Sequence, residues 1–194
     1  MFYYRKLTSK DKSIIPQITK IHIQEINDIT ISFGNEVINK FYELYLAKSL
    51  IYGIFEKKSN FLVGFVAFEF KDSQIYLNLL KNKKFILKII SIFFSKNLFR
   101  LIDVSVLFIW LNINNFYKEN RIQISYTVME KNYQSKGIYS KCIFDILNEV
   151  YKNYNKNYFI KTYSNESITK FYLSKGFKLI SKFKGRSILS YRIL

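Results

Sequence analysis

One segment constrains the fold of this chain more than any other. A β-rich run from Ile122 to Met129 passes through a polar turn, Tyr133 to Ser140, into a helical pattern. A strand that enters a helix through such a turn leaves backbone N–H groups without partners, and these groups converge at the positive end of the helix dipole. The arrangement suits a phosphate group. A glycine before a helix is common, so Gly137 in the turn does not by itself decide the function.

The rest of the chain alternates between strand and helix patterns after an initial hairpin, which indicates a mixed α/β sheet with helices packed on it. Residues 71–116 are predicted to form an apolar, mainly helical insertion, and residues 1–194 a single domain. The predicted elements are a strand at 2–7, a helix near 14–21, a second helix near 37–45, hairpin strands at 52–56 and 61–70, a strand at 122–129, a helix at 137–152, a strand at 158–163, a helix at 167–175, and closing strands at 178–183 and 187–193.

The formal net charge of +17 raises the question of nucleic-acid binding. The lysines are spread from end to end, and Ile, Asn, Lys, Phe and Tyr, all encoded by A/T-rich codons, are abundant together. Compositional drift explains that pattern better than a binding face does. We expect no nucleic-acid partner, and keep a basic nucleic-acid-binding protein, or a membrane-associated protein without catalysis, as the alternative.

Location and assembly are constrained by the lone cysteine and by the insertion. Cys142 cannot form a disulfide within the chain, and the N-terminus lacks the layout of a secretion signal, so we expect a cytoplasmic protein. Four charged residues interrupt the apolar run from Phe85 to Leu111. They exclude a membrane-spanning helix and predict two helices with wide apolar faces. Contact of the insertion with a membrane surface, and a homodimer, stay open.

A second motif follows the turn by about thirty residues. Asn165, Tyr172 and the pair Gly176-Phe177 occur in this order. Together with the turn, they resemble the two cofactor motifs of the GNAT superfamily of acetyl-CoA-dependent N-acetyltransferases. The resemblance implies the GNAT fold, acetyl-CoA as the co-substrate, a small-molecule amine as the acceptor, and no metal.

The first family motif is a strand followed by Gln or Arg, two residues, Gly, one residue, and then Gly or Ala. Gln134 and Gly137 match it, whereas Tyr139 departs from it. The family prefers a tiny residue there, so the ring of Tyr139 is expected to point away from the ligand, or the loop to be wider. By resemblance, the residues that bind the cofactor are Thr127, Val128, Met129, Gln134, Ser135, Lys136, Gly137, Ile138, Tyr139, Ser140 and Asn165.

Tyr172 is the candidate catalytic acid. In the family this tyrosine lies near the acetyl sulfur, and a phenol with a pKa of about 10 can protonate a departing thiolate. A core aromatic is the alternative. Where relatives carry a Glu as the base, this chain has Gln123. His22 is the first alternative base, although a lone histidine on a helix is more often structural. The weaker candidates are Glu25, Asp28 and Glu43.

A looser likeness concerns the acceptor. Ile21-His22-Ile23, Gly64-Phe65-Val66, the helical insertion, and Gly185-Arg186 followed by Tyr191 are similar to acetyltransferases found with bacterial surface-polysaccharide genes. That likeness implies an amino sugar or a sugar nucleotide as the acceptor. Arg186 would then contact a phosphate or carboxylate of the acceptor, or else be a solvated charge at a strand end.

Overall fold

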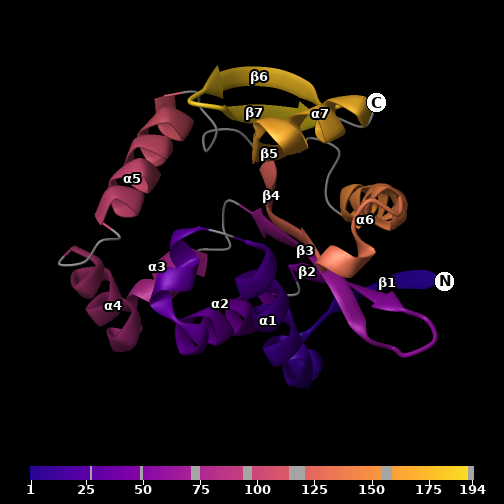
Figure 1. Cartoon of the computed structure of the whole chain (residues 1–194), viewed down its shortest axis with the longest axis horizontal. Coiled ribbons are helices and arrows are strands. Elements are labelled where there is room, and N and C mark those ends of the chain that lie inside the picture. Colours follow the sequence, from indigo (N-terminus) through magenta and orange to yellow (C-terminus); the bar gives the residue numbers. More distant parts are fainter. Residues whose placement is uncertain are drawn as a thin grey trace.

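The computed structural model describes residues 1–26, 28–48, 50–70, 75–93, 98–113, 121–153 and 159–191. A seven-stranded sheet runs through it in the order β1-β2-β3-β4-β5-β7-β6 (Figure 1). The neighbours β4 and β5 are parallel, and the other neighbouring strands are antiparallel. The strands are β1 (Phe2–Leu7), β2 (Ile51–Glu56), β3 (Leu62–Phe70), β4 (Arg121–Met129), β5 (Phe159–Asn165), β6 (Lys178–Phe183) and β7 (Arg186–Tyr191).

Helices cover both faces of the sheet. The α-helices are α1 (Ile15–Glu25), α2 (Asn35–Ala47), α3 (Ile75–Leu80), α4 (Lys83–Phe93), α5 (Leu98–Ile113), α6 (Ile138–Asn153) and α7 (Glu166–Ser174). Short 3₁₀ helices span Ser9–Ile14, Ile29–Phe33 and Lys131–Tyr133. These elements agree with the predicted order, including the hairpin of β2 and β3 and the helices of the insertion.

Strand β3 separates two apolar cores. Its Phe65 and Ala67 pack with α1 and α2 on one face of the sheet. Its Val66 and Phe68 pack with α6 and α7 on the other face. Successive side chains of a strand point to opposite faces, so a strand buried on both faces reads as a continuous apolar run. The sequence Leu62–Phe70 has this character, and its first seven residues are buried.

Local sequence sets the start of the 3₁₀ helix Ser9–Ile14, which leads directly into α1. The N–H of Thr8 donates to the carboxylate of Asp11 at 2.8 Å, and the Thr8 hydroxyl accepts from Lys10, which together form a capping box. Pro16 falls in the first turn of α1, where a missing N–H costs no helical hydrogen bond. The 3₁₀ helix therefore starts just after β1, and α1 follows it without a break.

Strands β4 and β5 pair over a short stretch and then diverge. The pairs run from Arg121 opposite Phe159 to Ile124 opposite Thr162. On the other side of β4, the register with β3 skips Ser125, which marks a β-bulge just after the last of these pairs. A bulge bends its strand and increases the local twist. From this point β4 continues to Met129 without β5 beside it, and the resulting gap positions the candidate site.

The insertion packs back onto the C-terminal hairpin through α5, which lies beside β6 and β7 in Figure 1. Trp110 of α5 joins a small apolar cluster with Ile188 of β7. A guanidinium nitrogen of Arg186 lies 2.6 Å from a carboxylate oxygen of Asp103, also on α5. Arg186 is thus engaged by the insertion. Among the described residues, none of the helices is long and apolar enough to span a bilayer.

Candidate active site where two strands diverge

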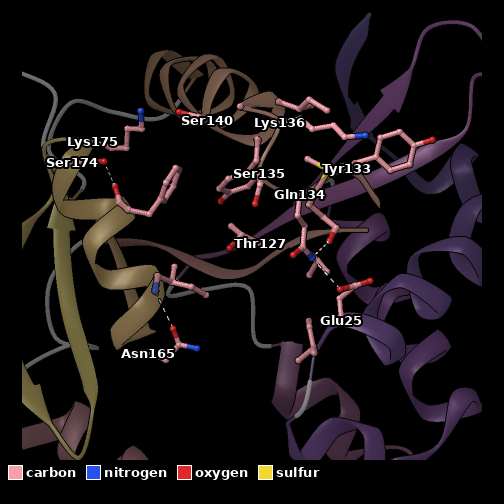
Figure 2. A pocket seen from close by; sticks show the side chains of 18 residues that line it. Glu25, Thr127, Tyr133, Gln134, Ser135, Lys136, Ser140, Asn165, Ser174 and Lys175 are labelled. Carbon is pink, nitrogen blue, oxygen red and sulfur yellow. Dashed lines mark hydrogen bonds between the residues drawn. The ribbon is translucent and has the colours of Figure 1, made fainter. Parts of the chain in front are cut away.

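A cavity of about 960 Å³ opens at the gap between β4 and β5 (Figure 2). Its wall combines the end of β4, the turn before α6, the first turn of α6, one face of α7 and the end of α1. The eleven residues proposed to bind the cofactor all line it. Its lining residues are Glu25, Ile26, Thr127, Val128, Met129, Tyr133, Gln134, Ser135, Lys136, Gly137, Ile138, Tyr139, Ser140, Asn165, Ile168, Phe171, Ser174 and Lys175.

The turn before α6 is held open by Gln134. Its side-chain amide donates to the carbonyl of Met129 at 2.7 Å and to the carboxylate of Glu25 at 3.0 Å. Its own N–H donates to the carbonyl of Lys131 at 3.2 Å. Ser135 and Gly137 then adopt positive φ values of 61° and 70°, which curl the backbone around the start of the helix. Such a curl directs successive N–H groups toward one point.

The amides that follow Gln134 are available to a ligand. Within the described part of the chain, the N–H groups of Ser135, Gly137 and Ile138 have no hydrogen-bond acceptor. They lie at the N-terminus of α6, which is sixteen residues long, so the helix dipole adds a partial positive charge. Diphosphates and other anions are bound by this combination of free amides and dipole.

Glu25 connects α1 to this turn. Its two carboxylate oxygens accept from the N–H of Lys131 at 2.9 Å and from the Gln134 amide at 3.0 Å. The carboxylate therefore fixes the start and the middle of the segment that leads into α6. The sequence suggested Glu25 as a weak candidate base, and the structure places it in the cavity wall with both oxygens hydrogen-bonded.

The face of α7 that lines the cavity was largely missed from the sequence. Asn165 caps the helix, with its side-chain oxygen accepting from the N–H of Ile168 at 3.1 Å (Figure 2). Phe171 and Lys175 follow on the same face, and the Lys175 ammonium lies 5.7 Å from the centre of the Phe171 ring. Their spacing from Asn165, with Ile168 between, follows the helical repeat. The helical spacing from Asn165 was therefore a signal in the sequence from which these cavity-lining residues could have been predicted.

Tyr172 lies behind the wall of the cavity. It is 2% exposed and does not line the cavity itself. Its hydroxyl lies 3.3 Å from the hydroxyl of Thr127 and 3.4 Å from that of Tyr139. Burial raises the pKa of the Tyr172 phenol above 10, and hydrogen bonds with Thr127, Tyr139 and Thr162 oppose that rise. The phenol thus stays protonated near neutral pH and is one hydrogen bond from two residues of the cavity wall.

Solved structures share this architecture, although no protein-family model and no curated protein sequence matches the chain. A polyamine N-acetyltransferase of Drosophila melanogaster is 7% identical with a TM-score of 0.66, over 100% of both chains. PaiA N-acetyltransferase of Thermoplasma acidophilum, in complex with coenzyme A, is 12% identical with a TM-score of 0.59, over 100% of this chain and 99% of that one. A GNAT-family acetyltransferase of Listeria monocytogenes is 9% identical with a TM-score of 0.56, over 99% and 95%. This chain has the GNAT fold.

The GNAT fold expected from the two motifs is therefore confirmed. The described part of the insertion, from α3 to α5, lies between the hairpin and the half of the fold that carries the cavity. In this GNAT fold the ring of Tyr139 crosses from α6 toward α7, and its centre lies 5.3 Å from that of Phe171. The ring lines the cavity, so the departure from the family motif fills space at the candidate site.

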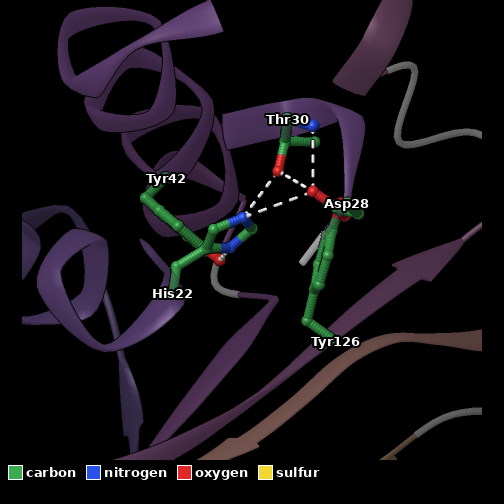
Figure 3. Close-up of polar contacts among 5 residues, drawn as sticks. All are labelled: His22, Asp28, Thr30, Tyr42 and Tyr126. Carbon is green, nitrogen blue, oxygen red and sulfur yellow. Dashed lines mark hydrogen bonds and ion pairs between the residues drawn. The ribbon is translucent and has the colours of Figure 1, made fainter. Parts of the chain in front are cut away.

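His22, the first alternative base, belongs to a closed polar cluster (Figure 3). The ring is fully buried, with Nδ1 2.5 Å from the Tyr42 hydroxyl and Nε2 2.6 Å from the Thr30 hydroxyl. Asp28 lies 3.8 Å from Nε2 and also accepts from Thr30. Both nitrogens have partners, and His22 does not line the cavity. This arrangement fits a structural histidine that holds α1 to α2.

The remaining candidate bases are also engaged. Burial raises the pKa of Asp28, but the nearby His22 ring and the hydrogen bonds from Thr30 outweigh it, and the resulting pKa lies below the usual value. Glu43 forms an ion pair with Lys40 at 2.7 Å, and it is not part of the cavity wall. Gln123 is buried and accepts from Arg121 at 3.0 Å. Of all these candidates, only Glu25 lines the cavity.

Cys142 is placed where it cannot serve as a nucleophile. It is 6% exposed on α6, within the core that α6 shares with the sheet. Burial, and after it the nearby Asp145 carboxylate, raises the pKa of the thiol. A reactive cysteine needs a lowered pKa and access to its substrate. Cys142 therefore does not fit the role of a nucleophile at this cavity, whose wall it does not form.

Proposed function

We propose that this chain is an acetyl-CoA-dependent N-acetyltransferase that passes the acetyl group directly to a primary amine. The observation that carries the proposal is the single cavity that joins the free amides before α6 to the diverging end of β4. A ligand with a diphosphate at one end and a thioester at the other end of a flexible arm matches both features. The neighbour PaiA, which is described in complex with coenzyme A, supports this choice.

Each part of the cavity binds a different part of the cofactor. The N–H groups of Ser135, Gly137 and Ile138 bind the diphosphate at the helix N-terminus. Beyond Ile124 the edge of β4 has no β5 pair, so the main chain at Thr127 to Met129 can pair with the amides of the pantetheine arm as another strand would. The ammonium groups of Lys136 and Lys175 add positive charge at the cavity wall. Asn165 borders the far side, at the start of α7.

The chemistry needs one acid at the sulfur. The amine nitrogen attacks the thioester carbonyl, and main-chain N–H groups of β4 stabilise the oxyanion of the tetrahedral intermediate. When the C–S bond breaks, the Tyr172 hydroxyl protonates the thiolate, and the new amide nitrogen loses its extra proton to water. The phenol, whose pKa burial raises above 10, is protonated near neutral pH and so has a proton to give.

The acceptor amine must enter in its neutral form. Among the described residues, Glu25 is the one candidate base in the cavity wall, and hydrogen bonds from Lys131 and Gln134 hold its carboxylate against the turn before α6. A general base has to reach the proton that it removes, directly or through one water. We therefore assign no protein base, and the amine loses its proton to solvent before it attacks.

The acceptor that we propose is an amino sugar, carried as a sugar nucleotide, in bacterial surface-polysaccharide synthesis in the cytoplasm. Among the described residues that line the cavity, Glu25 is the one carboxylate, against two lysines. The whole chain carries a net charge of +17. Such a field attracts a polyanion and repels a polycation. A nucleotide-linked amine fits it better than a polyamine, the acceptor named for the Drosophila neighbour.

Thiol release tests this function. Purified chain is mixed with acetyl-CoA and one of four acceptors: a nucleotide-linked amino sugar, a free amino sugar, a polyamine or an arylalkylamine. Free thiol is followed by absorbance, and binding of acetyl-CoA and of CoA by calorimetry. We expect binding of both and the fastest turnover with the nucleotide-linked acceptor. A chain that binds neither acetyl-CoA nor CoA would refute the function, and a preference for the polyamine would refute the acceptor class.

A further inference from the structure

Two phenols meet beside the cavity, and the sequence motif accounts for only one of them. The hydroxyls of Tyr139 and Tyr172 lie 3.4 Å apart, and Thr127 lies 3.3 Å from the second. Tyr139 enters from α6, Tyr172 from α7 and Thr127 from β4. Three elements thus bring three hydroxyl groups close together. One of them belongs to Tyr139, the residue that stands where the first motif has a glycine or alanine.

The two phenols differ in access. Tyr139 lines the cavity, with part of its surface exposed, whereas Tyr172 is 2% exposed and does not line it. Their rings are held separately, because Tyr139 packs against Phe171 at 5.3 Å and Tyr172 against Phe177 at 4.8 Å between ring centres. Neither ring can therefore turn freely, and the contact between the hydroxyls is set by packing. A proton that reaches the cavity can pass to Tyr172 through Tyr139.

We propose that Tyr139 is a positioning residue for Tyr172, whose hydroxyl it holds beside Thr127 and whose proton it restores after each acetyl transfer. The inference rests on the proposed function, since it assigns Tyr172 the role of acid. Tyr139 acts through Tyr172 and needs no contact of its own with the sulfur.

The proton balance closes without any further reagent. The Tyr172 O–H bond breaks as the S–H bond of CoA forms, which leaves a Tyr172 phenolate. The Tyr139 hydroxyl lies 3.4 Å from that oxygen, and its proton moves across as the phenolate forms. Water in the cavity then protonates Tyr139. The new amide has released one proton to water, so the number of protons taken from water equals the number returned to it.

The surroundings favour this pairing over other proton sources. The groups that face the Tyr172 hydroxyl are Thr127 from β4, Thr162 from β5 and Tyr139 from α6. Among these, Tyr139 is the one that titrates. Burial, and after it the neighbouring Tyr172, raises the pKa of Tyr139 well above 10. Both phenols are therefore protonated in the resting protein, so the pair holds two protons for one thiolate.

The test compares Tyr139→Phe, Tyr172→Phe and the double variant, each of which removes hydroxyl groups and keeps the rings. We expect Tyr139→Phe to lower kcat about tenfold with KM for acetyl-CoA within about twofold. The double variant should be no slower than Tyr172→Phe alone, because Tyr139 acts only through Tyr172. Tyr4→Phe removes a phenol hydroxyl on β1, outside the cavity, and is the matched control.

A second measurement separates this inference from the proposed function. In chain labelled with ¹³C at the phenol carbon of tyrosine, the Tyr172 resonance, assigned with Tyr172→Phe, should shift in Tyr139→Phe and stay in Tyr4→Phe. An unmoved resonance, an unchanged kcat or additive losses in the double variant would each overturn the inference. If the resonance shifts but the wild-type chain acetylates no amine, the proposed function fails and the pair is structural only.

Discussion

The hydroxyl of Thr127 lies 3.3 Å from the hydroxyl of Tyr172, across the gap that opens where β4 and β5 diverge. Thr127 lines the cavity and Tyr172 lies directly behind it. Under the proposed function, the thioester sulfur binds beside Thr127, at the part of the wall that lies next to the phenol. The bulge at Ser125, in the pairing of β4 with β3, lies directly after the last β4–β5 pair, at the point where β4 leaves β5.

Replacement of Tyr172 by Phe tests the acid directly. The change removes one hydroxyl and keeps the ring, so the cavity wall formed by Thr127 and Tyr139 is preserved. We expect kcat to fall by about 10²-fold or more, the usual contribution of a general acid. The dissociation constant of acetyl-CoA should change less than about threefold, because no lining residue is altered. Thiol release and calorimetry measure the two quantities.

The same variant has a small predicted cost in stability. Loss of the hydroxyl leaves Thr127 and Tyr139 each without one partner, at about 1 kcal/mol. Denaturant unfolding of Tyr172→Phe and the wild type checks this value. A fall in kcat that follows a much larger loss of stability would indicate a packing role, and an unchanged kcat would remove Tyr172 from the mechanism.

Alanine substitutions at two glycines distinguish the loss of a ligand contact from backbone strain. Gly137 in the turn and Gly185 in the β6–β7 hairpin have φ values of 70° and 72°, and a Cβ at either meets no heavy atom within 4 Å. Replacement by alanine should therefore lower the free energy of unfolding by a similar amount at both positions, about 1–2 kcal/mol, because of backbone strain. Only Gly137→Ala adds a methyl group at the cavity, so only it should weaken acetyl-CoA binding, by about tenfold or more. Equal affinities in the two variants would contradict a diphosphate at this turn.

The sequence was sufficient to predict the fold because the deciding signals were local. The strand, turn and helix around Gly137, and the helix cap at Asn165, are each set by residues a few positions apart. The eleven predicted cofactor residues come together because both motifs flank one parallel strand pair, β4 and β5. The mixed sheet with a helical insertion was therefore predicted correctly down to the order of its elements. Whether those residues bind coenzyme A stays a prediction.

Other features depended on contacts between distant residues. The sequence made His22 a candidate base because its hydrogen-bond partners could not be seen. Those partners, Thr30 and Tyr42, lie on other elements, and no sequence periodicity shows that both ring nitrogens are hydrogen-bonded. Arg186 was considered for a ligand, and its partner is Asp103, 83 residues earlier. The direction of the Tyr139 ring depends on packing against α7. Such contacts are set by the tertiary fold rather than by local sequence.

Asp28 contributes to stability through its lowered pKa. Burial raises this pKa, but the nearby His22 ring and the hydrogen bonds from Thr30 outweigh it, so the folded-state value lies below the unfolded one. A group of this kind stabilises the fold above its unfolded pKa, near 3.9, and the stabilisation is lost as pH falls through the folded value. Asp28→Asn should cost about 1 kcal/mol at pH 7, because partial exposure screens the charge.

Acid unfolding checks the sign of that effect. The difference in unfolding free energy between wild type and Asp28→Asn should be largest at pH 7 and shrink below about pH 4. Glu43→Gln is a suitable control, since its carboxylate forms a more exposed pair with Lys40. A difference that grew with acidity would mean that the charged carboxylate at position 28 is unfavourable in the fold.

Among the described residues of the cavity wall, Glu25 is the one candidate base and its carboxylate is held by hydrogen bonds, which predicts how the rate depends on pH. If the amine loses its proton to solvent, kcat/KM for the acceptor rises with pH and levels off at the pKa of that amine. Two acceptors with different pKa values, such as an amino sugar and an alkylamine, should then show two different midpoints. A protein base would give both acceptors the same midpoint. Glu25→Gln separates the cases further, because it keeps an acceptor for the Lys131 N–H but removes the carboxylate from the cavity. Midpoints that stay with the amines in this variant support deprotonation in solvent, and a shared midpoint that disappears would make Glu25 the base.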